Sequence, residues 1–336
     1  MENSINFDTF YNRELLPLLT EADKLRRQTR AKNRGITLKY IVITAAVILV
    51  GFLINRAIYG TWVHDDKANV PLIIMVIAVS GLIFYCRKAI KKNRGSFVGQ
   101  FKGDIIEKIV RFVDDNLTYN PYKMIPERDF LASKLFRRKP DSYNGDDFVS
   151  GTVGKTYIEF SEVHAKYLIQ DQDEDGNSRD RWEKLFDGLL FKADFNKHFN
   201  GEYFIFTEKP SRPSRLERLI NREEDRLKEK IETEDREFNR QFYVYGTDQL
   251  EARYILSASF MRRLLDFKQK TDKKIRLSFI GSSIYIAIPY KRNLFEPKYM
   301  TSVVDKDDTA EFYYDLRMVI DIVTELDLNT RIWSKQ

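Results

Sequence analysis

Cysteine and histidine are scarce in this 336-residue chain, which contains one cysteine and three histidines. The single cysteine, Cys86, excludes an intramolecular disulfide and fits a chain that folds mainly in a reducing compartment. The histidines are His64, His164 and His198, and only His164 has a nearby acid, Glu162. Their spacing matches neither a zinc site nor a catalytic triad. The sequence therefore assigns no catalytic residue and predicts no metal ion or cofactor.

Two short motifs resemble ligand loops but lack residues that such loops require. The segment Gly151-Thr-Val-Gly-Lys-Thr156 ends like a phosphate loop, yet Val149 stands where the first glycine is needed. The segment 171–176 has the carboxylates and glycine of half a calcium loop, but Trp182 replaces the glutamate that would bind with both oxygens. We therefore expect a glycine-containing bend into a strand and an acidic hairpin tip.

Charge is almost absent from two stretches near the start of the chain. Residues 36–54 contain one charged side chain, Lys39, and residues 70–86 contain none. At a rise of about 1.5 Å per residue, both can cross a hydrocarbon core of about 30 Å. Buried core helices are seldom apolar on every face, and the first stretch begins too far along the chain for a cleaved signal peptide. We interpret the two stretches as a transmembrane hairpin.

Lys and Arg flank the outer ends of this hairpin, whereas the connecting loop at 55–69 has only Arg56 and Lys67. The positive-inside rule then places both termini and the main domain in the cytosol and the loop outside. The same cations are candidates for contact with anionic lipid headgroups, and they account for part of the net charge of +6 without nucleic-acid binding. They are Lys24, Arg26, Arg27, Arg30, Lys32 and Arg34, followed by Arg87, Lys88, Lys91, Lys92 and Arg94.

These features divide the chain into three parts. We expect a cytosolic helical segment at 1–35, the hairpin with its basic flanks at 36–94 and a cytosolic domain at 95–336. The apolar side of the first segment fits either the membrane surface or the later domain.

Apolar periodicity predicts the elements of the cytosolic domain. Helices are expected at 96–117, 210–240, 248–268 and 309–326. Strands are expected at 152–160, 164–170, 185–195, 202–207, 237–245, 275–280 and 284–289, with turns at 142–146 and 200–201 and a charged loop at 171–181. Such interspersed elements predict an α+β fold with a mainly antiparallel sheet. The charged helix at 210–240 has a narrow apolar stripe, which makes it a candidate for binding a protein partner or for self-association.

Several segments resemble a family of bacterial membrane proteins called the domain of unknown function 3137, over about residues 95–326. The resemblance is carried by Gly151-x-x-Gly154-x-Thr156, Ile158-Glu-x-Ser-Glu162, the run from Leu185 to Phe199, the run from Tyr245 to Ser257, and Phe295-Glu-Pro297. It implies a multi-pass bacterial inner-membrane protein with a cytosolic domain. It implies no activity, because none is attached to the family.

Two functions are compatible with this sequence. The first is a non-enzymatic, membrane-anchored binding or scaffold domain that holds a protein or a headgroup near the bilayer. The alternative is a membrane-associated enzyme that uses carboxylates of the first strands, namely Glu159, Glu162, Asp187 and Asp194. An enzyme requires these carboxylates to converge with raised pKa values, whereas a scaffold leaves them apart. Two spans without an intramembrane ionisable residue disfavour a transporter.

Overall fold

The structure is a computed structural model of the chain, and it describes residues 7–59, 69–172, 178–194, 198–209, 229–271, 273–290 and 293–325. The chain forms two compact units that are discontinuous in sequence. The first contains Met1–Ile105 and Glu296–Asp308, and the second contains Ile106–Phe295 and Thr309–Gln336. The chain therefore passes between the two units at three points.

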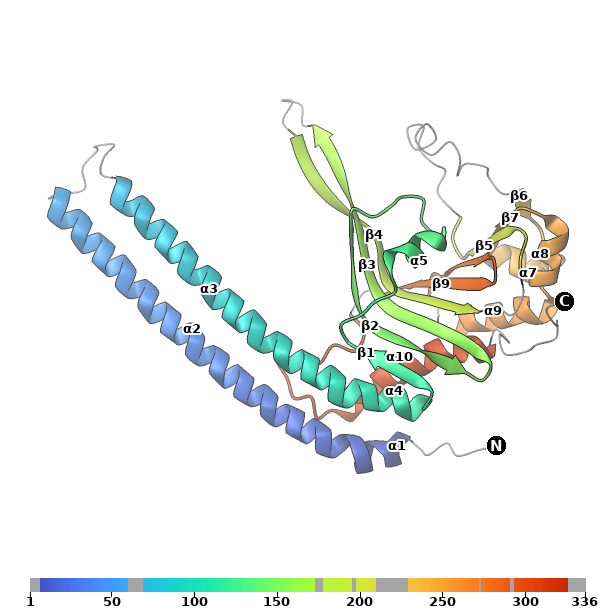
Figure 1. The fold of residues 1–336 in the computed structure, drawn as a ribbon, viewed down its shortest axis with the longest axis horizontal. Coiled ribbons are helices and arrows are strands. Elements are labelled where there is room, and N and C mark those ends of the chain that lie inside the picture. The colour runs from blue at the N-terminus through green and yellow to red at the C-terminus, as the bar shows by residue number, and fades with distance from the viewer. Residues whose placement is uncertain are drawn as a thin grey trace. The chain divides into compact units, whose positions relative to one another are not determined.

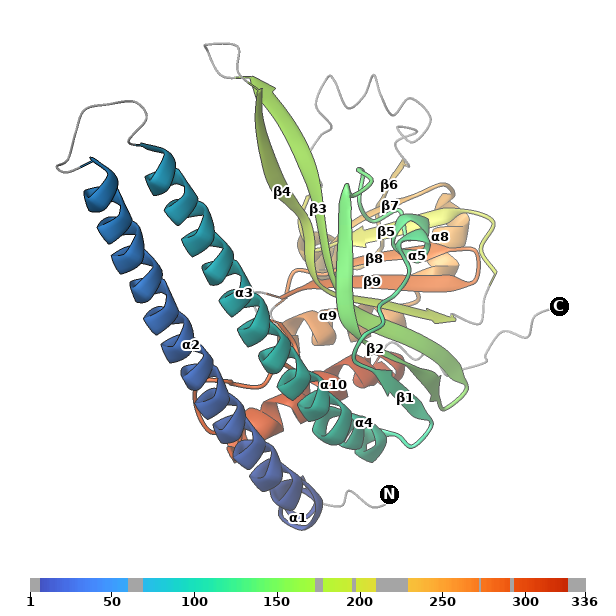
Figure 2. The ribbon, with the colours of Figure 1, turned by 60° about the vertical axis from the view of Figure 1, so that its left-hand side comes forward.

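The first unit is built on two long helices, which lie side by side in Figures 1 and 2. A short helix α1 (Phe7–Phe10) and a π-helical turn η1 (Tyr11–Leu15) lead into α2 (Leu16–Tyr59), and the second helix is α3 (Asn69–Phe101). Both are long and apolar enough to cross a membrane, and the most apolar 18-residue window of each is 0% buried. The helices approach closely at Gly51, where an added Cβ would lie 2.9 Å from the Met75 sulfur.

The second unit is a nine-stranded antiparallel sheet with helices, which confirms the predicted α+β class. The strand order is β1-β2-β3-β4-β9-β8-β5-β7-β6. The strands are β1 Leu117–Asn120, β2 Ser142–Val153, β3 Thr156–Gln172, β4 Ser178–Asp194, β5 Glu202–Phe206, β6 Glu229–Ile231, β7 Tyr243–Gly246, β8 Arg276–Ile280 and β9 Ser283–Pro289. The helices are α4 Glu107–Val113, α5 Glu127–Ala132, α7 Arg236–Gln241, α8 Gln249–Ile255, α9 Ala258–Thr271 and α10 Lys306–Glu325, the last beginning in the first unit; the π-helical turn η3 (Lys102–Ile106) precedes α4.

Helices cover both faces of the sheet. Phe130 of α5 belongs to a buried cluster with Val163 and Ala165 of β3 on one face. On the opposite face Phe260 of α9 packs edge-on against Phe279 of β8, with 5.7 Å between ring centroids. Figure 1 shows β3 and β4 extending as a long hairpin beyond the neighbouring strands. Alternate residues of β3 face opposite sides of the sheet.

The hairpin of β8 and β9 and the final helix agree with the predictions at 275–280, 284–289 and 309–326, but the first part of the domain differs. The helix predicted to reach residue 117 ends at Val113, and β1 begins at Leu117. The predicted turn at 142–146 is instead the start of β2, whose backbone pairs with β3 from Ser142 onward. Long-range strand pairing satisfies the backbone there and outweighs the local turn preference of Asn and Gly.

Other predicted elements also need correction. The turn at 200–201 does not join paired strands, because β4 pairs with β9 and β5 pairs with β7 and β8. Most of the strand predicted at 237–245 is helix α7, which the Asp235 carboxylate caps by accepting from the N–H groups of Glu237 and Phe238. The helix predicted at 248–268 breaks between α8 and α9. The helix predicted at 210–240 is wrong at its end, where β6 and α7 stand, and residues 210–228 lie outside the described residues.

Candidate functional site

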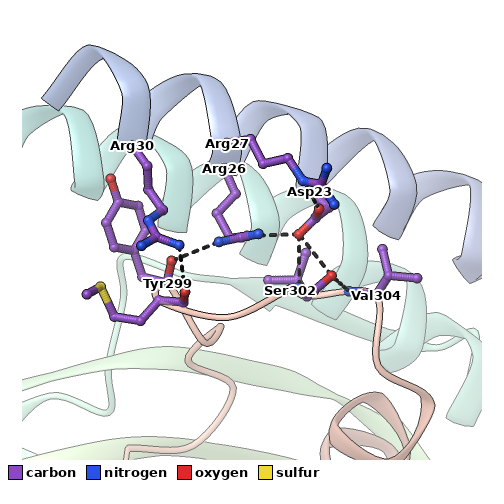
Figure 3. A network of polar contacts seen from close by, with 9 residues as sticks. Asp23, Arg26, Arg27, Arg30, Tyr299, Ser302 and Val304 are labelled. Carbon is purple, nitrogen blue, oxygen red and sulfur yellow. Dashed lines mark hydrogen bonds and ion pairs between the residues drawn. The ribbon is translucent and has the colours of Figure 1, made fainter. Parts of the chain in front are cut away.

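A polar clasp within the first unit joins α2 to the segment 296–308, which we call the return segment (Figure 3). We define the clasp as Asp23, Arg26, Arg30 and Asn33 of α2 together with residues 299–303. These residues are more than 260 positions apart in the sequence, with Arg30 and Met300 separated by 270. The α2 residues recur every three or four positions, so that they lie on one side of the helix.

Asp23 is the centre of the clasp, and its side chain is only 6% exposed. Its carboxylate accepts hydrogen bonds from Arg26 Nε at 2.8 Å and Arg27 Nε at 2.7 Å. It also accepts from the Ser302 hydroxyl at 3.1 Å and the Val303 N–H at 3.2 Å. Burial alone would raise the pKa of Asp23, but these four donors outweigh it and lower the pKa to about 2. Asp23 is thus charged at neutral pH.

Two arginines extend the clasp by binding backbone oxygens of the return segment. Arg26 donates through Nη1 to the Tyr299 carbonyl at 3.3 Å, and Arg30 donates through Nη1 to the Met300 carbonyl at 2.6 Å. Arg26 is buried between these partners. A guanidinium has several fixed donors, so that Arg26 contacts a carboxylate and a carbonyl at the same time.

Tyr299 connects the return segment to both long helices. Its hydroxyl accepts from Asn33 Nδ2 at 2.9 Å, and the Asn33 side-chain oxygen accepts from Asn93 Nδ2 of α3 at 2.8 Å. The Arg94 guanidinium lies 5.5 Å from the centre of the tyrosine ring, and the Phe97 ring lies 5.8 Å away. Because Lys102 of the same unit also pairs with Glu296 at 3.0 Å, the return segment is held at several points.

The structure separates the predicted headgroup-contact residues into two groups. Arg26 and Arg30 bind the return segment, Arg27 pairs with Asp23 while 74% of its side chain stays exposed, and Arg94 stacks on Tyr299. The other group is exposed, and it comprises Lys24, Lys32, Arg34, Arg87, Lys88, Lys91 and Lys92. Headgroup contact remains a prediction, best suited to the second group.

A second polar cluster lies on three neighbouring strands of the sheet. We call it the His164 cluster, and it comprises Asp146 of β2, Glu162 and His164 of β3, and Asp187 of β4. Asp146 stands opposite Glu162 in the register, and His164 stands opposite Asp187. Residues two apart on a strand, and residues paired across strands, project from the same face, which brings the four side chains together.

In the His164 cluster the imidazole lies between two carboxylates. His164 Nδ1 lies 2.5 Å from Asp187 Oδ1, and Nε2 lies 3.5 Å from Glu162 Oε1. Glu162 accepts the Leu294 N–H through Oε2 at 2.9 Å, and its side chain is 1% exposed. Lys184 also contacts Asp187, at 2.5 Å. Burial would raise the pKa of Asp187, but the hydrogen bonds from Lys184 and His164 lower it overall.

Strand alternation sends the four carboxylates of the enzyme hypothesis to two faces. Glu162 and Asp187 belong to the His164 cluster, whereas Glu159 stands opposite Lys192, whose Nζ is 3.9 Å away. Asp194 is two residues beyond Lys192 and shares its face. Lys192 also binds Asp129 at 2.7 Å. The structure therefore does not bring all four carboxylates into one site.

The remaining sequence motifs have structural explanations where the structure describes them. The glycine-rich segment 151–156 forms the tight turn from β2 to β3, with Gly154 at a φ of 62°. His198 contacts the Ser282 hydroxyl at 3.3 Å and lies away from the His164 cluster in the strand register. His64 and residues 173–177 of the acidic hairpin tip lie outside the described residues.

Residues 184–328 match the family described as "Protein of unknown function (DUF3137)". This match covers less than half of the chain. The match contains Asp187 of the His164 cluster and the whole return segment, whereas Asp23, Glu162 and His164 precede it. The similarity to this family thus covers one side of each polar site.

One solved structure similar to this chain is titled "crystal structure of the mycobacterial trehalose monomycolate transport factor A, TtfA". The identity is 10% and the TM-score is 0.32, over 66% of this chain and 96% of that chain. A similarity at this level carries no conclusion about the function of this chain. No curated protein sequence matches the chain.

Neither polar site could be recognised fully from the sequence. Asp146 was expected in a turn, and nothing marked Asp23, Tyr299 or Ser302 as partners. Glu162 and His164 do have a signal, because an acid and a histidine two positions apart share a face wherever the chain is extended. That alternation predicts a polar cluster but does not identify the partners from other strands.

Proposed function

We propose that this chain is a membrane-anchored binding or scaffold protein. In this proposal α2 and α3 cross the cell inner membrane, both termini and the sheet unit are cytosolic, and the loop at 55–69 is outside. The proposal rests first on the apolar surface of the two helices.

Most of the exposed large apolar side chains in the described part of the chain lie between Leu38 and Tyr85. Ile41, Leu49 and Ile77 are 59%, 58% and 65% exposed. An apolar surface of this extent is unfavourable in water and favourable in the hydrocarbon core of a bilayer. That core also requires every backbone N–H and C=O to be hydrogen-bonded within the protein, as they are in a helix. Both conditions are met between the basic flanks, which supports a membrane hairpin with cytosolic ends.

The clasp supports a scaffold instead of a simple tether. Asn33 lies three residues before the first predicted span, and Asp23 lies roughly 20 Å from that span along the helix. The return segment is therefore bound to the part of α2 that leaves the membrane. The return segment continues at both ends into the sheet unit. The chain therefore connects the helix pair to the sheet unit at three points, after residues 105, 295 and 308.

The enzyme alternative receives less support from the geometry. Its four carboxylates divide between two faces of the sheet, and the pKa of Asp187 is lowered, whereas a general acid at neutral pH needs a raised pKa. We therefore favour binding of a protein or of anionic headgroups. The exposed cations of the basic flanks and the charged segment 210–240 are the proposed contact regions.

The anchor and its orientation can be tested through Cys86, the single thiol. In intact cells, Cys86 should react with a membrane-permeant maleimide and resist an impermeant one. A matched variant with Cys86→Ser and His64→Cys moves the thiol into the loop, which should then react with the impermeant reagent. The opposite labelling pattern would refute the orientation, and extraction of the protein by alkaline carbonate without detergent would refute the anchor.

Binding can be separated from catalysis by mild detergent extraction and mass spectrometry of the intact complexes. A stoichiometric protein, or anionic lipid lost on Lys91→Gln and Lys92→Gln, would support the scaffold. Lys108→Gln, which removes a cation of α4 outside the basic flanks, serves as the control for each of these substitutions made singly. Recovery of the chain with a bound small metabolite instead would favour the enzyme.

A further inference from the structure

The His164 cluster has the arrangement of a metal site. We propose that Asp146, Glu162 and His164 bind a divalent first-row transition-metal ion, with Asp187 as a positioning residue for His164. This inference does not depend on the membrane anchor. One ligand atom from each of the three residues lies within 4.8 Å of the others.

The key distance is the 3.5 Å between His164 Nε2 and Glu162 Oε1. It is long for a hydrogen bond between these atoms. It is the distance expected between two ligands of one ion, because atoms about 2.1 Å from a tetrahedral centre lie about 3.4 Å apart. The two side chains are thus spaced for a shared ion without rearrangement.

Asp187 provides the outer contact that metal-binding histidines usually make. With the Nδ1 proton donated to Asp187 Oδ1 at 2.5 Å, the Nε2 lone pair is directed to the side where Glu162 lies. A carboxylate that binds the far nitrogen fixes the tautomer and the ring orientation and strengthens the nitrogen as a ligand. Lys184 in turn holds the other oxygen of Asp187. The ring is therefore oriented before any ion binds.

Glu162 is equally well fixed, because its Oε2 accepts the Leu294 N–H and leaves Oε1 on the histidine side. The backbone beside it is closely packed. A Cβ on Gly145, the neighbour of Asp146, would lie 2.1 Å from the Glu162 carbonyl oxygen. Glycine at this position lets β2 approach β3 and brings Asp146 to Glu162. Ligands held on rigid strands are what a selective metal site requires.

The ligand types indicate the class of metal. One imidazole nitrogen with carboxylate oxygens suits Zn²⁺, Mn²⁺ or Fe²⁺, whereas Ca²⁺ and Mg²⁺ prefer oxygen ligands alone. Three protein ligands leave at least one position for water or another ligand. His164 is 29% exposed, so that this position is reachable from solvent.

The experiment uses the full-length chain in detergent, in a Cys86→Ser background that removes the thiol, after treatment with a chelator. Zn²⁺ should bind with 1:1 stoichiometry by calorimetry, and Co²⁺ should give visible absorption bands of low-symmetry coordination. Asp187→Asn should weaken Zn²⁺ binding about 10- to 100-fold while the Co²⁺ bands persist. His164→Gln and Glu162→Gln should weaken it further and abolish the bands.

His198→Gln is the matched control, because it removes an exposed histidine of the same unit and should leave binding unchanged. Unchanged Zn²⁺ affinity in His164→Gln, or no 1:1 binding by the parent chain, would overturn the proposal. Thermal unfolding of each variant without metal checks that the fold persists. Where a variant fails to fold, anomalous scattering at the zinc edge from parent crystals decides: an ion bonded to His164 Nε2 supports the site, and an ion elsewhere refutes it.

Discussion

Replacing Asp23 with asparagine tests the clasp most directly. The change removes one negative charge from a buried site where Arg26 is also buried and paired to it. Loss of one partner of a buried ion pair typically costs about 3–5 kcal/mol. The pKa gives an independent lower figure, because its fall from 3.8 to about 2 corresponds to about 2 kcal/mol of interaction with the charged form. We therefore expect the return segment to lose about 2–4 kcal/mol of local stability.

Hydrogen exchange of the return segment measures this loss. The Val303 N–H donates to Asp23, so that its exchange reports opening of the clasp. A loss of about 2–4 kcal/mol accelerates exchange roughly 30- to 1000-fold in peptides that cover 299–303. Glu21→Gln is the control, because Glu21 is an exposed carboxylate of the same helix. Equal protection in both variants would show that the ion pair does not hold the segment.

Three further predictions concern the same contacts and the sheet. Because the pKa of Asp23 is lowered in the fold, its stabilising effect is present above the ordinary pKa of 3.8 and is lost as the pH falls through about 2. The protection of residues 299–303, measured as the exchange rate relative to the intrinsic rate at the same pH, should fall over that range in the parent chain and much less in Asp23→Asn. Tyr299→Phe removes the acceptor of the Asn33 amide and should destabilise the first unit by about 1 kcal/mol in denaturant unfolding, while an unchanged midpoint would show that the hydrogen bond contributes nothing. Gly145→Ala should destabilise the sheet by more than about 3 kcal/mol or prevent folding, because the new Cβ would overlap a backbone oxygen of the facing strand. The control is Gly95→Ala, which has nothing within 4 Å of its new Cβ and should be neutral or slightly stabilising. Thermal melting followed by circular dichroism measures both variants.

The sequence pattern correctly predicted two kinds of element. In one kind the paired strands are neighbours in the sequence, and in the other a helix has an unbroken apolar stretch or an apolar face. The two apolar stretches lie within α2 and α3, and the hairpin of β8 and β9 is where alternation and the turn at Gly281 place it. The final helix also agrees, since its apolar residues recur at helical spacing. In each case the pattern that predicts the element lies within the element itself or its adjacent turn.

Predictions failed where distant pairing decides the structure. The strand β2 forms in a segment rich in turn residues because β1 and β3 both pair with it. Residues 237–241 belong to a predicted strand but form part of α7, since Asp235 caps a helix start. The His164 cluster shows the same limit. His164 and Glu162 share a strand and a face, whereas Asp146 and Asp187 join them through the register alone.

The clasp extends this reasoning to the organisation of the whole chain. Apolar stretches predict a helical hairpin that is complete in residues 36–94. Yet Asn33 of α2 donates to the hydroxyl of Tyr299 and accepts from Asn93 of α3. Asp23 and Arg26 are also buried where they bond residues of 299–303. A hairpin without the return segment would leave that arginine and that carboxylate facing water on one side. A chain ended after residue 295 should therefore still insert into the membrane, because the apolar stretches are unchanged. Its α2 should exchange amide protons faster around Asp23 than around the spans, and equal protection of α2 with and without 296–308 would show that the helix pair is self-sufficient.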